Sequence, residues 1–288
     1  MWPIFQNAVA RSRGAMLGWG LALGLLGMFM LSFFEILADQ KESLERLLAS
    51  YPPEMMAFFG DTTAMFTPEG FLGVEFFSFM PIVLGIYAVL AGSGLLAADE
   101  ESGTLDLLLA HPVSRTALFF GRGLAFLTTL LGILGAAWLG LVIGARVYDV
   151  DLTATSLLRP FLSLLGELLL FGAFALLLSM FVPSRRLAAM LSGLALMTSY
   201  FITSLARINE DLEQAAKFSP LNYYQSGDAI TQLNLEWLLG LLVVALVFTL
   251  LAWWRFERRD IRVAGEGSWR WPWQQFRTYE RKSGLQPR

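Results

Sequence analysis

Long apolar runs alternate with short polar segments along most of the chain. Six of these runs reach about 20 residues, the length that a helix needs to cross the hydrocarbon core of a bilayer. They are apolar on all sides, whereas a helix on the surface of a soluble protein keeps a polar face. The pattern predicts six transmembrane helices, at residues 14–37, 71–98, 117–145, 157–182, 187–205 and 235–254.

The composition agrees with an all-α, polytopic membrane protein. Hydrophobic residues make up 56% of the 288 positions and charged residues 16%, whereas a soluble domain carries about 25% charged residues. The first run is longer than the apolar core of a signal peptide and no convincing cleavage site comes after it, so we expect it to be retained. The absence of cysteine excludes a disulfide framework.

The charge of the connecting segments predicts their side of the membrane. After Trp254, nine basic residues face four acidic ones, a balance of +5, whereas the loop 38–70 has a balance of −4. Because short basic segments stay in the cytoplasm, both termini are expected there. The Arg185–Arg186 turn agrees with that orientation.

The soluble ends divide the chain into three parts. Residues 1–13 place Trp2, Phe5 and Val9 on one helical face, which predicts a short interfacial elbow helix on the inner leaflet before the chain turns into the membrane. Residues 14–262 form the transmembrane domain, with a cytoplasmic loop at 99–116. Residues 263–288 form a basic, Trp-rich cytoplasmic tail.

The polar segment 99–116 has the features of a short helix with sharp ends. Gly103 can begin a helix, and Asp106 suits its positive N-terminal end. Pro112 ends it, and Ser114 is a good N-cap for the next span. The acids at 99–101 would be repelled by an anionic inner leaflet, so a basic groove on a protein partner is favoured over simple packing on the bilayer.

The same residues carry a family resemblance. The run Glu100-Glu101-x-Gly103-Thr104-Leu105, followed by Leu108-Leu109-x-His111-Pro112-Val113-Ser114-Arg115, resembles the cytoplasmic loop of ABC-2 type transporter permeases. Asp106 stands where that family has Glu. The pairs Ser219-Pro220 and Tyr223-Tyr224, and the run 256–261, are also similar to the family.

The resemblance implies a type V exporter-like fold in the plasma membrane of a prokaryote. It implies two permease copies, identical or related, around a central pathway, each seated on a separate ABC ATPase. It implies short helices within 206–234 that cap the pathway. It also implies export of a lipid, a drug or a peptide. Coupling contacts would come from Glu100, Glu101, Gly103, Thr104, Leu105, Asp106, Leu108, Leu109, His111, Pro112 and Arg115.

The absence of an ATP-binding motif agrees with a separate ATPase subunit. The chain has no G-x-x-x-x-G-K-[ST] phosphate loop, so ATP and Mg²⁺ are expected on the partner ATPase and no cofactor on this chain. His111 is the only histidine, so conventional zinc sites are excluded. We expect no catalytic activity of the chain itself and no nucleic-acid partner.

Two carboxylates are candidates for the translocation pathway. Glu167 lies near the middle of the fourth span, where an ionised group is costly. It is expected to face the protein interior, protonated or bonded to a hydroxyl such as Thr128, Thr129 or Thr198. The alternative is a purely structural hydrogen bond. Glu75 lies nearer the outer end of the second span and is the weaker candidate.

Glycines four residues apart suggest close helix contacts, within the chain or along a dimer seam. They are Gly14, Gly18, Gly20 and Gly24 in the first span and Gly140 and Gly144 in the third. Two other functions stay open from the residues alone. A stand-alone secondary transporter would need binding sites at the membrane midplane, and a non-transporting scaffold or sensor would need only the polar segment.

Overall fold

A computed structural model describes residues 1–40, 66–105, 113–206 and 209–258. Helices dominate these residues, and no strand occurs among them. Within these described residues, six helical stretches are long and apolar enough to cross a membrane, which confirms the predicted number of spans. The elements are α1 (Trp2–Asp39), α4 (Pro68–Leu72), η2 (Gly73–Phe77), α5 (Met80–Gly94), α6 (Ala97–Glu101), α8 (Arg115–Val147), α9 (Ala154–Phe181), α10 (Arg185–Ala206), η3 (Glu210–Leu212), α11 (Glu213–Ala216), η4 (Pro220–Tyr223), α12 (Asp228–Thr231) and α13 (Leu235–Arg258).

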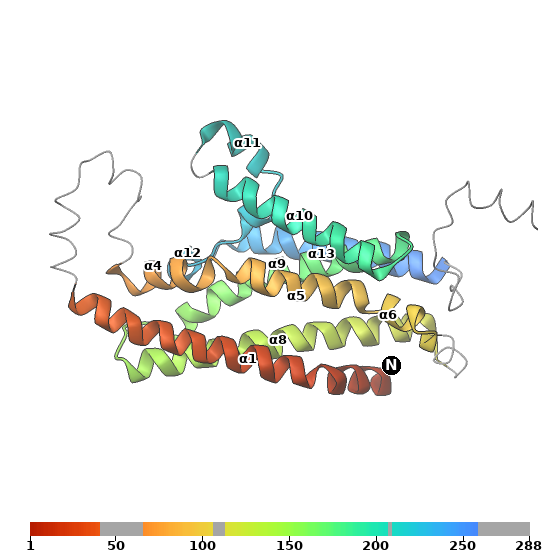
Figure 1. Cartoon of the computed structure of the whole chain (residues 1–288), viewed down its shortest axis with the longest axis horizontal. Coiled ribbons are helices and arrows are strands. Elements are labelled where there is room, and N and C mark those ends of the chain that lie inside the picture. The colour runs from red at the N-terminus through yellow and green to blue at the C-terminus, as the bar shows by residue number, and fades with distance from the viewer. Residues whose placement is uncertain (41–65, 106–112, 207–208, 259–288) are drawn as a thin grey trace, which may run out of the picture.

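The long helices form one elongated bundle (Figure 1). The N-terminus, α6, the starts of α8 and α10 and the end of α13 gather at one end, here called the N-terminal end. Helices α4 and α12 lie at the opposite end, here called the far end. Successive spans therefore alternate in direction, as six crossings of one bilayer require.

Helix α1 corrects the expected elbow helix. The structure has one uninterrupted helix of 38 residues from Trp2 to Asp39, without a break between residues 13 and 14. No proline or capping residue stands there to end a helix, and a single glycine inside a helix costs only about 1 kcal/mol. At 1.5 Å per residue α1 is about 57 Å long, well beyond the 30 Å or so of a hydrocarbon core.

Small residues let α1 and α8 pack closely along their length. A Cβ added to Gly140 would overlap the backbone of Gly24, and one added to Gly144 would lie 3.0 Å from Cα of Met28. The glycine spacing thus marks a seam within the chain. Gly14 and Gly18 have nothing within 4 Å of an added Cβ, so they take no part in it.

The second span is interrupted before Pro81. A π-helical turn, η2, connects α4 to α5, and proline at position 81 cannot donate to the carbonyl of Phe77. The hydroxyl of Tyr224 donates to that carbonyl instead, at 2.8 Å. The segment 209–234 is thereby anchored on the broken part of the span, where Gly227 also touches Gly73.

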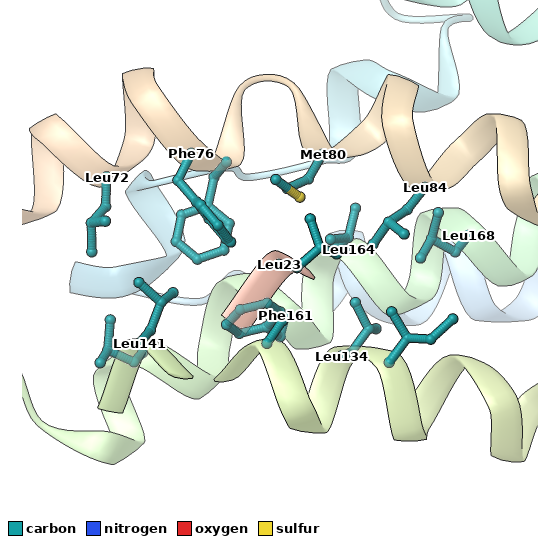
Figure 2. Packing of buried hydrophobic residues seen from close by; sticks show 14 of the residues in the cluster. Leu23, Leu72, Phe76, Met80, Leu84, Leu134, Leu141, Phe161, Leu164 and Leu168 are labelled. Atoms are coloured by element: carbon teal, nitrogen blue, oxygen red, sulfur yellow. The ribbon is translucent and has the colours of Figure 1, made fainter. Parts of the chain in front are cut away.

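The main core lies where α5, α8 and α9 meet η2 (Figure 2). Phe76, Phe77 and Phe161 make edge-on ring contacts, with the Phe77 and Phe161 centroids 5.2 Å apart. Leu23 brings α1 into this cluster, and Tyr224 and Ile230 bring in the segment 209–234. The main core therefore packs η2, α5, α8 and α9 together, and a separate apolar cluster that includes Leu105, Leu118 and Phe256 lies at the N-terminal end beside the polar contacts.

The close packing of α1 against α8 can be tested by adding a single methyl group. Gly140→Ala is expected to lower the melting temperature of the detergent-purified protein by several degrees, because overpacking costs about 1–3 kcal/mol. Gly135→Ala on the same helix is the control, since an added Cβ there meets nothing within 4 Å. Equal melting temperatures for the two variants would show that α1 and α8 do not pack as described.

Candidate functional site

The polar segment begins as a helix and then turns. Helix α6 ends at Glu101, and the backbone of Gly103 has φ 70°, a left-handed conformation that favours glycine. The chain is helical again at positions 104 and 105. The predicted contacts Asp106, Leu108, Leu109, His111 and Pro112 lie outside the described residues. Gly103 therefore separates α6 from the helical turn at 104 and 105, as the expected helix start requires.

Asp99 is the centre of a charged cluster at the N-terminal end. Its carboxylate forms an ion pair with Arg122 of α8, and Arg11 of α1 lies 4.0 Å away. Thr104 also donates to this carboxylate, at 3.3 Å. Asp99 is only 7% exposed. One buried carboxylate thus links the polar segment to two long helices.

The two glutamates of the segment have different environments. Glu100 is buried, whereas Glu101 is exposed and accepts a hydrogen bond of 2.7 Å from the backbone N–H of Arg185. That N–H is at the first residue of α10, so Glu101 caps this helix. The sequence predicted that the acids at 99–101 all face a partner. The structure holds Asp99 and Glu100 inside the chain instead.

Arg115 fastens the other side of the segment. Its guanidinium donates to the backbone carbonyl of Phe256 at 3.2 Å, near the negative C-terminal end of α13. Ser114 caps α8 by accepting from the N–H of Ala117, which confirms the predicted N-cap. Leu105 is 2% exposed and packs in a cluster that includes Phe256. The described part of the segment is therefore attached to α8, α10 and α13.

Glu167 is fully buried in the middle of α9, as the sequence predicted. Neither carboxylate oxygen has a hydrogen-bond partner among the described residues. The three expected threonines, all in the described part of the chain, do not bond to it, because Thr128 and Thr129 donate to carbonyls of their own helix and Thr198 is exposed. An ionised carboxylate without a partner is very costly in such a place, so we expect the neutral acid.

The segment 209–234 lies over the face of α9 that carries Glu167. Ser163, one turn before Glu167, accepts a hydrogen bond of 3.0 Å from the N–H of Gln225. Burial raises the pKa of Tyr224. Its hydroxyl therefore stays protonated and keeps its bond to the second span. Ser199 and Thr203 of α10 bond to Ser219, so α10 is joined to the same segment.

A cavity of about 510 Å³ opens beside this contact at the far end of the bundle. Glu69, Asp228 and Tyr224 are among its lining residues. Neither predicted pathway carboxylate lines it, since Glu167 is enclosed by the bundle and Glu75 is exposed on η2. The structure therefore does not bring the two candidates together.

Sequence reasoning missed the residues that hold the site together. Arg11, Arg122 and Arg185 surround α6 from three helices, and Ser163 and Tyr224 hold the far end. Arg122 offered a signal, because it is an arginine inside an otherwise apolar run and should have a partner. Arg11, Arg185 and Ser163 gave no signal of these contacts, since their partners are distant in sequence. Tyr224 belongs to the pair that is similar to the family, but that pair did not indicate its bond to the second span.

Comparison with known proteins agrees with this architecture. A family model described as ABC-2 family transporter protein matches residues 5–261. The chain is also 25% identical over 213 residues to YdbK, an uncharacterized membrane protein of Bacillus subtilis (strain 168). That match covers 68% of this chain and 86% of the relative. The family match extends over all six spans of the bundle.

The free-energy cost of burying the Glu167 carboxyl without a partner can be measured. Glu167→Leu is expected to raise thermal stability by about 1–3 kcal/mol, because it removes a buried polar group without a partner. The measurement is thermal unfolding of the purified protein, with Leu168→Met as a control for repacking on the same helix. A loss of stability in Glu167→Leu would reveal a structural hydrogen bond and contradict the described environment.

Proposed function

The chain belongs to the ABC-2 family of transporter proteins, and from that membership we propose that it is the permease subunit of a transporter driven by a separate ATPase. As a multi-pass membrane protein of this family, it provides the path through the bilayer. The ATPase provides the energy. The polar segment 99–116 connects the two subunits.

The main support for this proposal is the attachment of the polar segment to transmembrane helices. Asp99, Glu101 and Arg115 attach the segment to α8, α10 and α13. A force applied to residues 106–112 is therefore passed directly to transmembrane helices. A loop that only rested on the bilayer would need no such attachments.

The chemistry of the chain requires that the energy come from elsewhere. The sequence has no phosphate loop, and none of its three lysines follows a glycine. ATP and Mg²⁺ thus bind to the ATPase subunit, and this chain is the mechanical partner rather than an enzyme. Both termini and the polar segment lie on the cytoplasmic side, in agreement with the basic charge after Trp254.

Two permease copies form the working transporter, with the pathway between or within them. The complex lies in the plasma membrane of a prokaryote and exports an apolar or amphipathic substrate such as a lipid, a drug or a peptide. Glu167 is the residue of the pathway or its gate, because a neutral acid kept without a partner is costly and is retained where function needs it. Glu75 contributes at the outer end, where it is exposed.

The ATPase contact can be tested by association. Replacement of Leu108 and Leu109 by aspartate is expected to remove an apolar anchor for the partner. The fraction of ABC ATPase that co-purifies with the tagged chain should then fall at least roughly tenfold, the effect of about 1.4 kcal/mol. The measurement is mass spectrometry of the complex isolated from host membranes.

Phe218→Asp is the matched control. Phe218 is an apolar residue of the far end that is 90% exposed, so its replacement also adds a charge to the surface. This variant should keep the ATPase. If wild-type chain isolates without any ABC ATPase, or if the Leu108/Leu109 variant keeps it, the proposed coupling role is wrong.

A further inference from the structure

A second cavity lies at the N-terminal end of the bundle, among α1, α5, α8 and α10. Its volume is about 250 Å³. Three arginines from three different helices line it, Arg11, Arg122 and Arg185, together with Ser12, Tyr87 and Thr129. Guanidinium groups repel one another, so their convergence on one space needs a negative charge to balance it.

The acids of α6 lie beside this cavity and not among its lining residues. Asp99 pairs with Arg122 and lies 4.0 Å from Arg11, but no carboxylate is among the residues that line the cavity. Glu101 accepts from the backbone of Arg185, and the guanidinium of Arg185 lies over Gly94 instead. Among the described residues, Arg185 has no ion pair, and 66% of the Arg11 side chain is exposed.

The rest of the lining is apolar and reaches the surface of the bundle. Leu90, Leu95 and Phe126 form this part of the wall. Leu90 is 49% exposed on the outside of α5, so the cavity opens sideways toward the hydrocarbon. A basic pocket with an apolar opening fits a molecule that has an anionic head and an apolar tail.

We propose that this cavity binds the phosphate headgroup of an anionic phospholipid, with the acyl chains passing out beside Leu90. Arginine suits this role because its fork of donors matches phosphate oxygens in two-point hydrogen bonds. Basic pockets between transmembrane helices on the cytoplasmic side are a known form of lipid recognition. The bound phosphate would join α1, α8 and α10 through one anion, next to the polar segment.

The chain offers a closely matched set of variants for the test. Arg11→Gln with Arg185→Gln removes two cavity charges. Arg13→Gln with Arg186→Gln removes two charges from the same helices, two residues and one residue away, at exposed positions that do not line the cavity. Each protein is purified in detergent, and its retention of phosphatidylglycerol against phosphatidylcholine is measured by native mass spectrometry.

We expect wild type and the Arg13/Arg186 variant to retain phosphatidylglycerol preferentially. The Arg11/Arg185 variant should bind it roughly tenfold or more weakly, given about 1 kcal/mol for each arginine near an anionic headgroup. Size-exclusion profiles check folding, and Arg11→Gln alone serves if the double variant fails to fold. Equal loss in both double variants, or no preference in wild type, would overturn the proposal.

A competition arm separates the lipid from a free anion. Inorganic phosphate and glycerol phosphate at matched concentrations should not displace phosphatidylglycerol, because they lack acyl chains to fill the apolar opening. Displacement by either would assign the cavity to a soluble phosphate and overturn the lipid assignment. Because neither arm uses ATP or the ATPase, failure here leaves the proposed function untouched.

Discussion

The ion pair between Asp99 and Arg122 is the contact on which the N-terminal end of the bundle depends. It joins the polar segment to α8, and Arg11 extends it to α1. Both partners are largely buried, with 10% and 15% of their side chains exposed. Removing one partner would leave a buried charge alone, at a cost of about 3–5 kcal/mol. Two further contacts lie at the same end of the bundle: Glu101 caps α10, and Arg115 donates to a carbonyl near the end of α13.

The far end of the bundle is held by a different constraint. Within a bilayer each backbone polar group must find a partner in the protein, and Pro81 leaves the carbonyl of Phe77 without its helical donor. Tyr224 supplies one and so fixes the segment 209–234 over the second span. Among the described residues, buried side-chain polar atoms without a hydrogen-bond partner occur on Glu167, Ser192 and Trp253, and Glu167 is the acid of the three. The bundle is therefore held by an ion pair at the N-terminal end and by the Tyr224 hydroxyl at the far end. Glu167, whose burial costs free energy, lies between them.

Hydropathy was enough to predict the spans, because in lipid the apolar length and the helix are set by the same requirement. The predicted span 157–182 became Ala154–Phe181, and Ser114 is the N-cap that its position indicated. Three features were not predicted. The continuity of α1 was missed, although no proline or capping residue stands between residues 13 and 14 to end a helix. The burial of Asp99 depends on Arg122, which is distant in sequence. No threonine bonds to Glu167, because the hydroxyls of Thr128 and Thr129 donate to carbonyls of their own helix, which the sequence does not show.

A double-mutant cycle on Asp99 and Arg122 tests the central claim most directly, that this buried pair makes the polar segment part of the bundle. Thermal unfolding would be measured for Asp99→Asn, Arg122→Gln and the double variant in the same detergent. Each single variant should be strongly destabilised, and the double variant should lose less than the sum, with an interaction energy of about 1–3 kcal/mol. Additive losses would mean that the two residues do not interact, and the polar segment would then lack the attachment described for it.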